Sequence, residues 1–90
     1  MLFRSPVSQE TAAAMAVAVR EKLAADYGVA ITGNAGPNAD VDGKPVGLVF
    51  VAIASQNGVK VDESQFRGTR EDIRRRGEQV ALRLLREQII

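Results

Sequence analysis

The stretch VGLVFVAIASQNG, residues 46–58, decides the fold class of this chain. Residues 46–54 are apolar at almost every position, which predicts a central strand that is covered on both faces. The pair Asn57-Gly58 favours a type I′ turn, because that turn needs positive φ at both central positions. We therefore expect a hairpin that returns along residues 59–66. This outer strand carries the charged residues Lys60, Asp62 and Glu63.

A short apolar segment and a helical pattern precede the central strand. Residues 29–32 are predicted to form a buried strand that ends at a glycine-rich loop. Upstream, apolar residues recur with helical spacing after Ser8, which is a good N-cap. Val7 and Ala12 stand where a hydrophobic staple would form, and Gly28 is the expected C-terminal stop of this helix.

A second helix is predicted at the end of the sequence. Thr69 is its expected N-cap, with Asp72 three residues on as an imperfect capping box. The predicted order is helix, strand, long loop, strand, hairpin, strand, helix. This order indicates an α/β fold with a mixed sheet of about three strands flanked by two helices.

The composition excludes several classes of chemistry. The 90 residues suit one soluble globular domain, and the net charge of +1 gives no overall reason to expect nucleic acid or an anionic membrane as a partner. Because the chain has no cysteine and no histidine, it has no thiolate nucleophile, no imidazole base and no Cys/His zinc site. We expect a cytoplasmic protein with no cofactor, no metal and no membrane span.

The loop after the first strand is a candidate ligand site. Residues 30–47 contain four glycines and two prolines, and glycine lets backbone N–H groups approach an anion closely. The spacing matches neither the dinucleotide fingerprint nor a Walker loop, so an irregular crossover is the alternative interpretation. The length of the loop favours function, because so long a loop is unusual in a small domain.

Basic residues offer a second anion-binding feature. Arg70 and Arg67 lie beside the N–H groups at the start of the second helix and could hold a phosphate or carboxylate. For Arg70 there are two equal interpretations: it binds an anionic ligand, or it is a charged residue of the first turn that binds none. The run Arg74–Arg76 is expected to be a solvated helix face. Lys44, held by the following proline, points either into the loop's ligand or into water.

Three segments together resemble the C-terminal domain of the CinA proteins, the family that includes the PncC nicotinamide-mononucleotide deamidases. The segment ADYGVAITGNAGPNADVDGKPVG, residues 25–47, resembles the family's A-D-Y, [ST]-G-I-A-G-P and K-P-V-G motifs at the family spacing. Residues 7–16, VSQETAAAMA, resemble V-S-E-E-x-A-x-x-M-A, and residues 66–76, FRGTREDIRRR, resemble F-x-G-D-R-x-x-[VI]-R.

The resemblance implies a three-layer α/β/α sandwich. It also implies hydrolysis of the carboxamide of nicotinamide mononucleotide to nicotinic acid mononucleotide and ammonia, a step of pyridine-nucleotide salvage. Carried over to this chain, the residues that would line the nucleotide site are Thr32, Gly33, Asn34, Ala35, Gly36 and Lys44, with Arg70 facing the anionic part of the substrate. Asn34 replaces an apolar residue of the family pattern, and Thr69 replaces an aspartate.

The chain resembles only the second half of the family domain. The family's nucleophilic serine and its lysine lie in segments that match nothing here, so we expect a single partial domain over residues 1–90 that is inactive alone. Residues 7–90 are family-like, and residues 1–6 are expected to be non-native or disordered. A non-catalytic nucleotide-binding module and a self-associating module, a possible homo-oligomer, are the alternatives.

Overall fold

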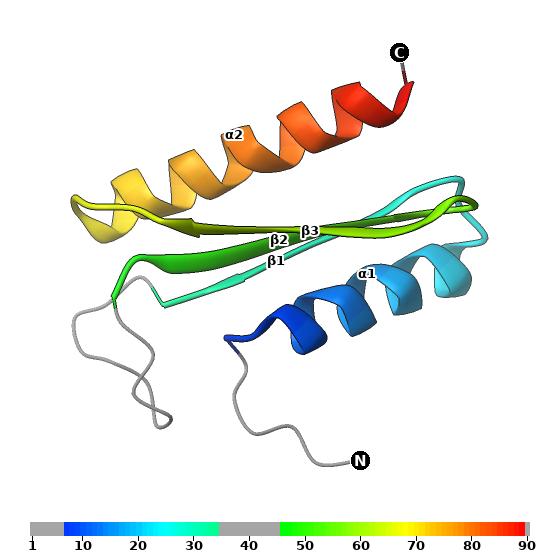
Figure 1. Ribbon diagram of the computed structural model, residues 1–90, viewed down its shortest axis with the longest axis horizontal. Coiled ribbons are helices and arrows are strands. Elements are labelled where there is room, and N and C mark those ends of the chain that lie inside the picture. Colours follow the sequence, from blue (N-terminus) through cyan, green and yellow to red (C-terminus); the bar gives the residue numbers. More distant parts are fainter. Residues whose placement is uncertain (1–6, 35–45, 90) are drawn as a thin grey trace.

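Three strands form the middle layer of the molecule, and one helix covers each face of the sheet (Figure 1). This computed structural model describes residues 7–34 and 46–89. The predicted two helices, three strands and three layers are confirmed. In chain order the elements are α1 (Gln9–Leu23), β1 (Gly28–Gly33), β2 (Leu48–Ser55), β3 (Gly58–Gln65) and α2 (Arg70–Ile89).

The strand predicted to be central, β2, lies between β1 and β3. It pairs antiparallel with both, and Ala52 lies opposite Ala30 on one side and Val61 on the other. The described sheet is therefore wholly antiparallel, where a mixed sheet was predicted. A parallel pair needs a crossover that carries the chain back along the sheet, whereas here β2 starts at the end where β1 stops.

The two faces of β2 form two separate cores, which explains why this strand is apolar from Leu48 to Ala54. Alternate side chains of a strand point to opposite faces. On one face the buried residues pack with α1, and on the other they pack with α2. The first core contains Val7, Ala12, Ala16, Ala30, Leu48, Phe50, Ala52 and Ala54. The second contains Val49, Val51, Ile53, Ile73, Val80 and Leu84.

Both predicted helix starts are confirmed. The Oγ of Ser8 accepts a hydrogen bond from the backbone N–H of Thr11 at 3.0 Å, and Val7 is buried in the same core as Ala12, as a hydrophobic staple requires. At α2, the N–H of Asp72 donates to the hydroxyl of Thr69 at 3.1 Å. The N–H of Thr69 donates to the Asp72 carboxylate at 3.0 Å, so the capping box is reciprocal.

The predicted stop of α1 at Gly28 is wrong. The helix ends at Leu23, and Ala24 takes the left-handed conformation with φ of 50°. Gly28 is instead the first residue of β1, where a Cβ would lie 2.1 Å from the carbonyl oxygen of Ala16. Glycine is needed there because the strand crosses α1 closely.

The hairpin between β2 and β3 is confirmed, but its predicted turn is shifted by one residue. Ser55 pairs with Gly58, so the two turn residues are Gln56 and Asn57. A type I′ turn over Asn57-Gly58 needs positive φ at both residues, but of these two residues Gly58 alone has positive φ, at 116°. The N–H of Asn57 bonds to the Oγ of Ser55 at 3.1 Å, which stabilises the observed turn.

Candidate functional site

The end of β1, the start of β2, the end of β3 and the start of α2 lie at one end of the sheet. Because both strand pairs are antiparallel, the last residue of β1 lies beside the start of β2, which lies beside the end of β3. The start of α2 follows β3 closely and lies at the same end of the molecule (Figure 1). Of the predicted site residues that the structure describes, the segment Thr32–Asn34 and Arg70 are thus brought to a common end of the fold.

Backbone hydrogen bonds tie this end together around Gly47. The N–H of Asn34 donates to the carbonyl of Leu48 at 3.0 Å, and the N–H of Gly47 donates to the carbonyl of Asn34. The carbonyl of Gly47 accepts from the N–H of Phe66 at 2.9 Å. Gly47 has φ of 90°, and a Cβ there would lie 2.0 Å from the carbonyl oxygen of Phe66. The last glycine of the K-P-V-G motif is therefore explained by backbone packing.

The predicted site residues at the end of β1 are consecutive, but the Thr32 side chain lies on the opposite face of the sheet from Arg70. Thr32 is half-buried and lies opposite Phe50, which places its side chain on the α1 face. Gly33 is exposed, and Asn34 is half-buried just beyond the strand. Arg70 is exposed in the first turn of α2, on the other face. Ala35, Gly36 and Lys44 lie outside the described residues.

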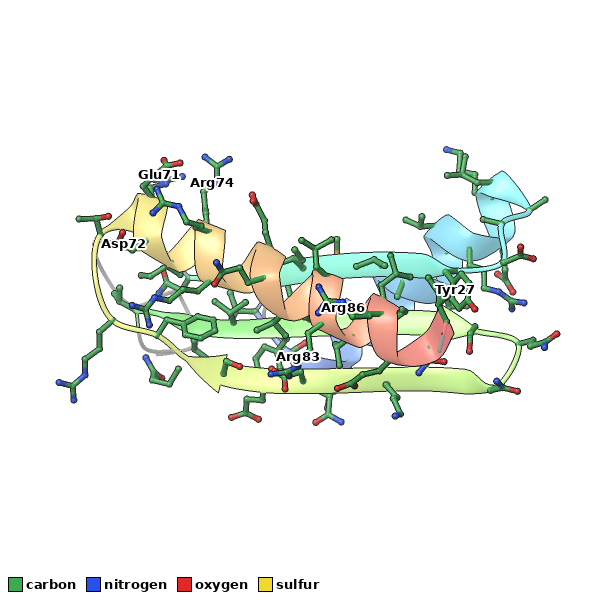
Figure 2. All side chains as sticks on the ribbon, turned by 90° about the horizontal axis from the view of Figure 1, so that it is seen from above. Tyr27, Glu71, Asp72, Arg74, Arg83 and Arg86 are labelled. Atoms are coloured by element: carbon green, nitrogen blue, oxygen red, sulfur yellow. The ribbon has the colours of Figure 1, made fainter. Side chains whose placement is uncertain are left out.

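The start of α2 combines a helix N-terminus with charges of both signs. Glu71, Asp72 and Arg74 project from it (Figure 2). The pKa of the Asp72 carboxyl is lowered, chiefly because it accepts the backbone hydrogen bond from Thr69, with a smaller contribution from the nearby guanidinium groups. Asp72 is therefore used by the helix cap, and Arg70 lies exposed in the same first turn of α2.

A second cationic feature was not predicted from the sequence. Arg75, Arg76 and Arg83 line an open cavity of about 500 Å³ on the side of α2 that faces Phe66. Asp72, Gln79 and Val80 complete the lining. The predicted solvated face at Arg74–Arg76 is confirmed, since all three residues are exposed. The spacing 72, 75, 76, 79 and 83 places the helical lining on one face of α2, which helical periodicity indicates, but the cavity also needs Phe66 from outside the helix.

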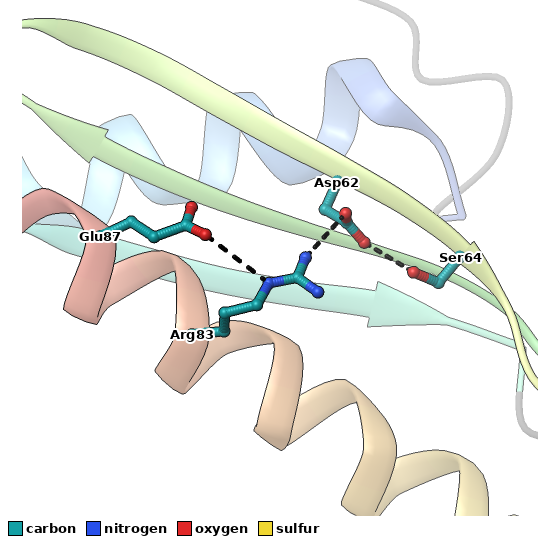
Figure 3. Close-up of polar contacts among 4 residues, drawn as sticks. All are labelled: Asp62, Ser64, Arg83 and Glu87. Carbon is teal, nitrogen blue, oxygen red and sulfur yellow. Dashed lines mark hydrogen bonds and ion pairs between the residues drawn. The ribbon is translucent and has the colours of Figure 1, made fainter.

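Part of this charge is neutralised by β3. Arg83 Nη2 lies 3.2 Å from the carboxylate of Asp62, and its Nε lies 4.0 Å from Glu87 (Figure 3). The hydroxyl of Ser64 donates to Asp62 at 2.6 Å. Since the Arg83 side chain is more than half exposed, the pair contributes little to stability. It does hold the Arg83 guanidinium against the strand.

Packing and a backbone hydrogen bond account for two residues of the A-D-Y motif, Asp26 and Tyr27. Tyr27 packs against the α2-side core, and the Nε–H of Arg20 donates to the carbonyl of Asp26 at 3.1 Å. A cavity of about 150 Å³ beside these residues is lined also by the β2–β3 turn. Of the predicted site residues within the described ranges, Thr32, Gly33, Asn34 and Arg70, none lines either of these two cavities.

Metal-binding clusters and membrane-spanning helices are both absent from residues 7–34 and 46–89. These residues contain no group of three or more His, Cys, Asp or Glu side chains that could hold a metal ion. Neither of the two helices described is long and apolar enough to span a bilayer.

Comparison with known proteins identifies the family. Residues 3–89 match the CinA C-terminal domain. This chain belongs to the CinA C-terminal domain family. It is 45% identical over 84 residues to a CinA-like protein of Koribacter versatilis, and 46% identical over 82 residues to a putative competence-damage inducible protein of Moorella thermoacetica. These matches cover 93% and 91% of this chain and 20% of each relative.

Solved structures of CinA proteins share the fold. A CinA superfamily protein of Enterobacter cloacae matches with a TM-score of 0.89 at 28% identity, over 97% of this chain and 52% of that one. One from Escherichia coli matches with a TM-score of 0.87 at 34% identity, over 96% and 49%. The chain thus spans about half the length of the solved CinA relatives and about a fifth of the curated ones.

Proposed function

We propose that this chain forms the nucleotide-binding half of a nicotinamide-nucleotide amidohydrolase. The complete enzyme would convert nicotinamide mononucleotide and water to nicotinic acid mononucleotide and ammonia. Membership of the CinA C-terminal domain family supports the proposal. The observation that carries it is the meeting of the Thr32–Asn34 segment and the arginine-bearing start of α2 at one end of the sheet.

The two features suit the two polar parts of a mononucleotide. Backbone N–H groups next to glycine can approach a carbonyl or phosphate oxygen closely, because no Cβ intervenes. The guanidinium of Arg70 stands at a helix N-terminus, where a phosphate is favoured by both the side chain and the helix dipole. In this proposal Arg70 and the β1 end bind and orient the nucleotide.

The chemistry itself would come from the other half of the domain. A lysine-activated serine would attack the amide carbon, and the amide nitrogen would leave as ammonia after taking up a proton. Water would then cleave the acyl-enzyme ester, releasing the acid and restoring the serine. This chain has no matching serine or lysine segment, so we propose that it is inactive alone. Ammonia release from nicotinamide mononucleotide by the purified chain, above that of a heat-denatured sample, would contradict this.

Binding tests the site without requiring catalysis. We expect nicotinamide mononucleotide to shift the amide resonances of Thr32, Gly33 and Asn34 in an NMR titration, together with those at the start of α2. Arg70→Ala should weaken the binding about tenfold or more, since a hydrogen bond to a charged group contributes roughly 1.5–3 kcal/mol. Arg74→Ala, an exposed arginine one turn later, is the matched control and should change the affinity little.

Two results of this titration would reject the proposed site. Shifts confined to the lining of the cavity, at Arg75, Arg76 and Arg83, would place the nucleotide there instead. Equal losses of affinity in Arg70→Ala and Arg74→Ala would show that only general positive charge matters. Binding at the proposed end without ammonia release, even when the other half is supplied, would favour a non-catalytic nucleotide-binding module.

A further inference from the structure

The open cavity of about 500 Å³ beside α2 takes no part in the proposed function. Arg75, Arg76 and Arg83 line it, and we refer to it as the arginine cavity. Its volume falls within the roughly 300–1,000 Å³ of pockets that hold small molecules. Its lining shares no residue with the Thr32–Asn34 segment or with Arg70, so it is a separate candidate site.

The arginine cavity is open because α2 does not cover β3. Directly paired residues of neighbouring strands share a face of the sheet. Asp62 pairs with Val51, which is buried in the α2-side core, and Ser64 pairs with a residue of the same core. Both polar side chains therefore point to the α2 side. Among its described members, that core contains no residue of β3, so this side of the strand stays polar and open.

The carboxylates around the cavity already have partners within the protein. Asp72 lines the cavity and accepts the backbone N–H of Thr69 at 3.0 Å. Asp62 accepts the hydroxyl of Ser64 at 2.6 Å and lies 3.2 Å from Nη2 of Arg83 (Figure 3). Both carboxylates are thus held in place, and the charge of Arg83 is partly neutralised.

Two cations of the cavity form no ion pair with any residue that the structure describes. These are Arg75 and Arg76, and both are exposed. They lie close enough to Asp72 to contribute to the lowered pKa of its carboxyl, which stays bound at the helix cap. An anion that entered the cavity would meet two guanidinium groups that are free to form charge-assisted hydrogen bonds.

An apolar patch lies beside these guanidinium groups. Phe66 lines the cavity, is half-buried and packs against the α2-side core. Val80 also lines the cavity and is buried in that core. An aromatic side chain that is only partly covered offers a surface on which a planar ring can pack. The cavity therefore combines a cationic part with an apolar part.

The cationic part suits a phosphomonoester better than a carboxylate. A phosphomonoester carries a charge of about −1.5 to −2 at pH 7 and three acceptor oxygens. A carboxylate carries one negative charge and two oxygens, whereas the two guanidinium groups offer two positive charges. We propose that the arginine cavity binds a small phosphomonoester that carries a neutral aromatic ring, with the phosphate at Arg75 and Arg76 and the ring against Phe66.

The ligand of this cavity differs in kind from the substrate of the proposed function. The ring of nicotinamide mononucleotide is a pyridinium cation, which three arginines disfavour by like-charge repulsion. A simple aryl phosphate and a nucleoside monophosphate with an uncharged base both have the required chemistry. The proposal depends on the lining of the cavity alone, so it stands or falls separately from the nucleotide site at the end of β1.

An NMR titration of the 90-residue chain with phenyl phosphate tests the site. We expect shifts of the backbone amides of Phe66 and Gln79, and of the Nε–H groups of Arg75 and Arg76. Benzoate, with the same ring but one charge, and inorganic phosphate, without the ring, should each bind at least tenfold more weakly. Absence of these shifts, or equal affinity for either control, would overturn the proposal.

A titration with adenosine monophosphate distinguishes the two sources of this chemistry. Shifts of the same resonances at lower concentration than with phenyl phosphate would identify a nucleoside monophosphate as the better ligand. Shifts that need a higher concentration would identify the smaller aryl phosphate. Nicotinamide mononucleotide should shift the cavity resonances less than either, and equal shifts would overturn the requirement for a neutral ring.

Variants of single arginines locate the phosphate. Arg75→Gln and Arg76→Gln should each weaken the binding of phenyl phosphate about tenfold, since each removes a charge-assisted hydrogen bond. Arg86→Gln is the matched control, because Arg86 is exposed on the same helix but does not line the cavity, and it should change the affinity little. Circular dichroism verifies that these surface variants fold. Equal losses in the control and in the cavity variants would overturn the proposal.

One further variant separates this proposal from the proposed function. Arg70→Ala should leave the binding of phenyl phosphate unchanged, although it should weaken that of nicotinamide mononucleotide at the end of β1. A loss of phenyl phosphate binding in Arg70→Ala would place the aryl phosphate at the start of α2 and overturn the site in the arginine cavity. Failure of nicotinamide mononucleotide to bind would reject only the proposed function.

Discussion

At the scale of single residues, Gly77 shows that a glycine in a helix can be dispensable even where it touches the sheet. It lies in the middle of α2 and is buried. A Cβ there would meet Val49 at 3.5 Å and Ile31 at 3.6 Å, which are ordinary van der Waals distances. The glycine therefore weakens the helix without being required by packing.

We predict that Gly77→Ala raises the free energy of unfolding by about 0.5–1 kcal/mol, because alanine is the better helix former and the added methyl group fits. Urea denaturation measures this as a higher midpoint. Gly47→Ala is the contrasting variant and should destabilise the fold, because φ is 90° and the Cβ would overlap the carbonyl of Phe66. A loss of stability in Gly77→Ala would show that α2 packs more tightly on the sheet than these distances allow.

Asp72 links the stability of α2 to pH. Its pKa is lowered from 3.8 in the folded protein, so the folded state favours the ionised carboxylate. The sign follows from this direction: the stabilisation is complete above 3.8 and is lost as the pH falls below that value. We predict that the stability difference between the wild type and Asp72→Asn shrinks as the pH is lowered from 5 towards 2.

Urea denaturation at each pH gives this difference. Asp72→Asn is the matched variant, because its amide oxygen can still accept a hydrogen bond from Thr69 but carries no charge. A difference that stays constant between pH 5 and pH 2 would contradict the lowered pKa.

At the scale of elements, the termination of α1 depends on a residue with an unfavourable backbone conformation. Ala24 has φ of 50°, the left-handed region that favours glycine. We predict that Ala24→Gly stabilises the protein by about 0.5–1 kcal/mol, since the relief of strain exceeds the added flexibility of the unfolded chain. Thermal unfolding measures the shift. Ala14→Gly, in the exposed middle of α1, should instead destabilise by about 1 kcal/mol, and equal effects would argue against a strained cap.

The same helix end shows where prediction from sequence stops. The elements themselves were predictable, because β2 is apolar on both faces and because Ser8 and Thr69 are local capping signals. The stop of α1 was not, since Gly28 serves the close crossing of β1 over α1, a tertiary contact. The predicted turn was one residue out of place for a related reason. The pair Asn57-Gly58 indicates a hairpin, but the pairing of β2 with β3 decides which residues form the turn.

The candidate site was predictable in its parts and not in its arrangement. The glycine-rich segment after β1 and Arg70 could be singled out from motifs and from helix electrostatics. That Thr32 and Arg70 lie on opposite faces depends on the register of β1 against β2, for which a single strand carries no local signal. The cavity lined by Arg75, Arg76 and Arg83 requires knowledge of which side of α2 meets the chain after β3.

At the scale of the whole molecule, one strand supports both cores. Phe50 belongs to the α1-side core and its neighbour Val51 to the α2-side core. A chain of this size buries a modest share of its surface, so neither layer is expected to be stable without the other. The fold should therefore unfold as one unit.

We predict that Phe50→Ala, which costs about 3–5 kcal/mol for a buried aromatic residue, lowers the protection of amides in α2 as much as in α1. Hydrogen exchange followed by mass spectrometry measures both helices in one experiment. Leu82→Ala, on the exposed face of α2, is the control and should change protection little, because it creates no cavity. If α2 kept its protection while α1 lost it, the two layers would be separate folding units, and the shared strand β2 would not couple the two cores.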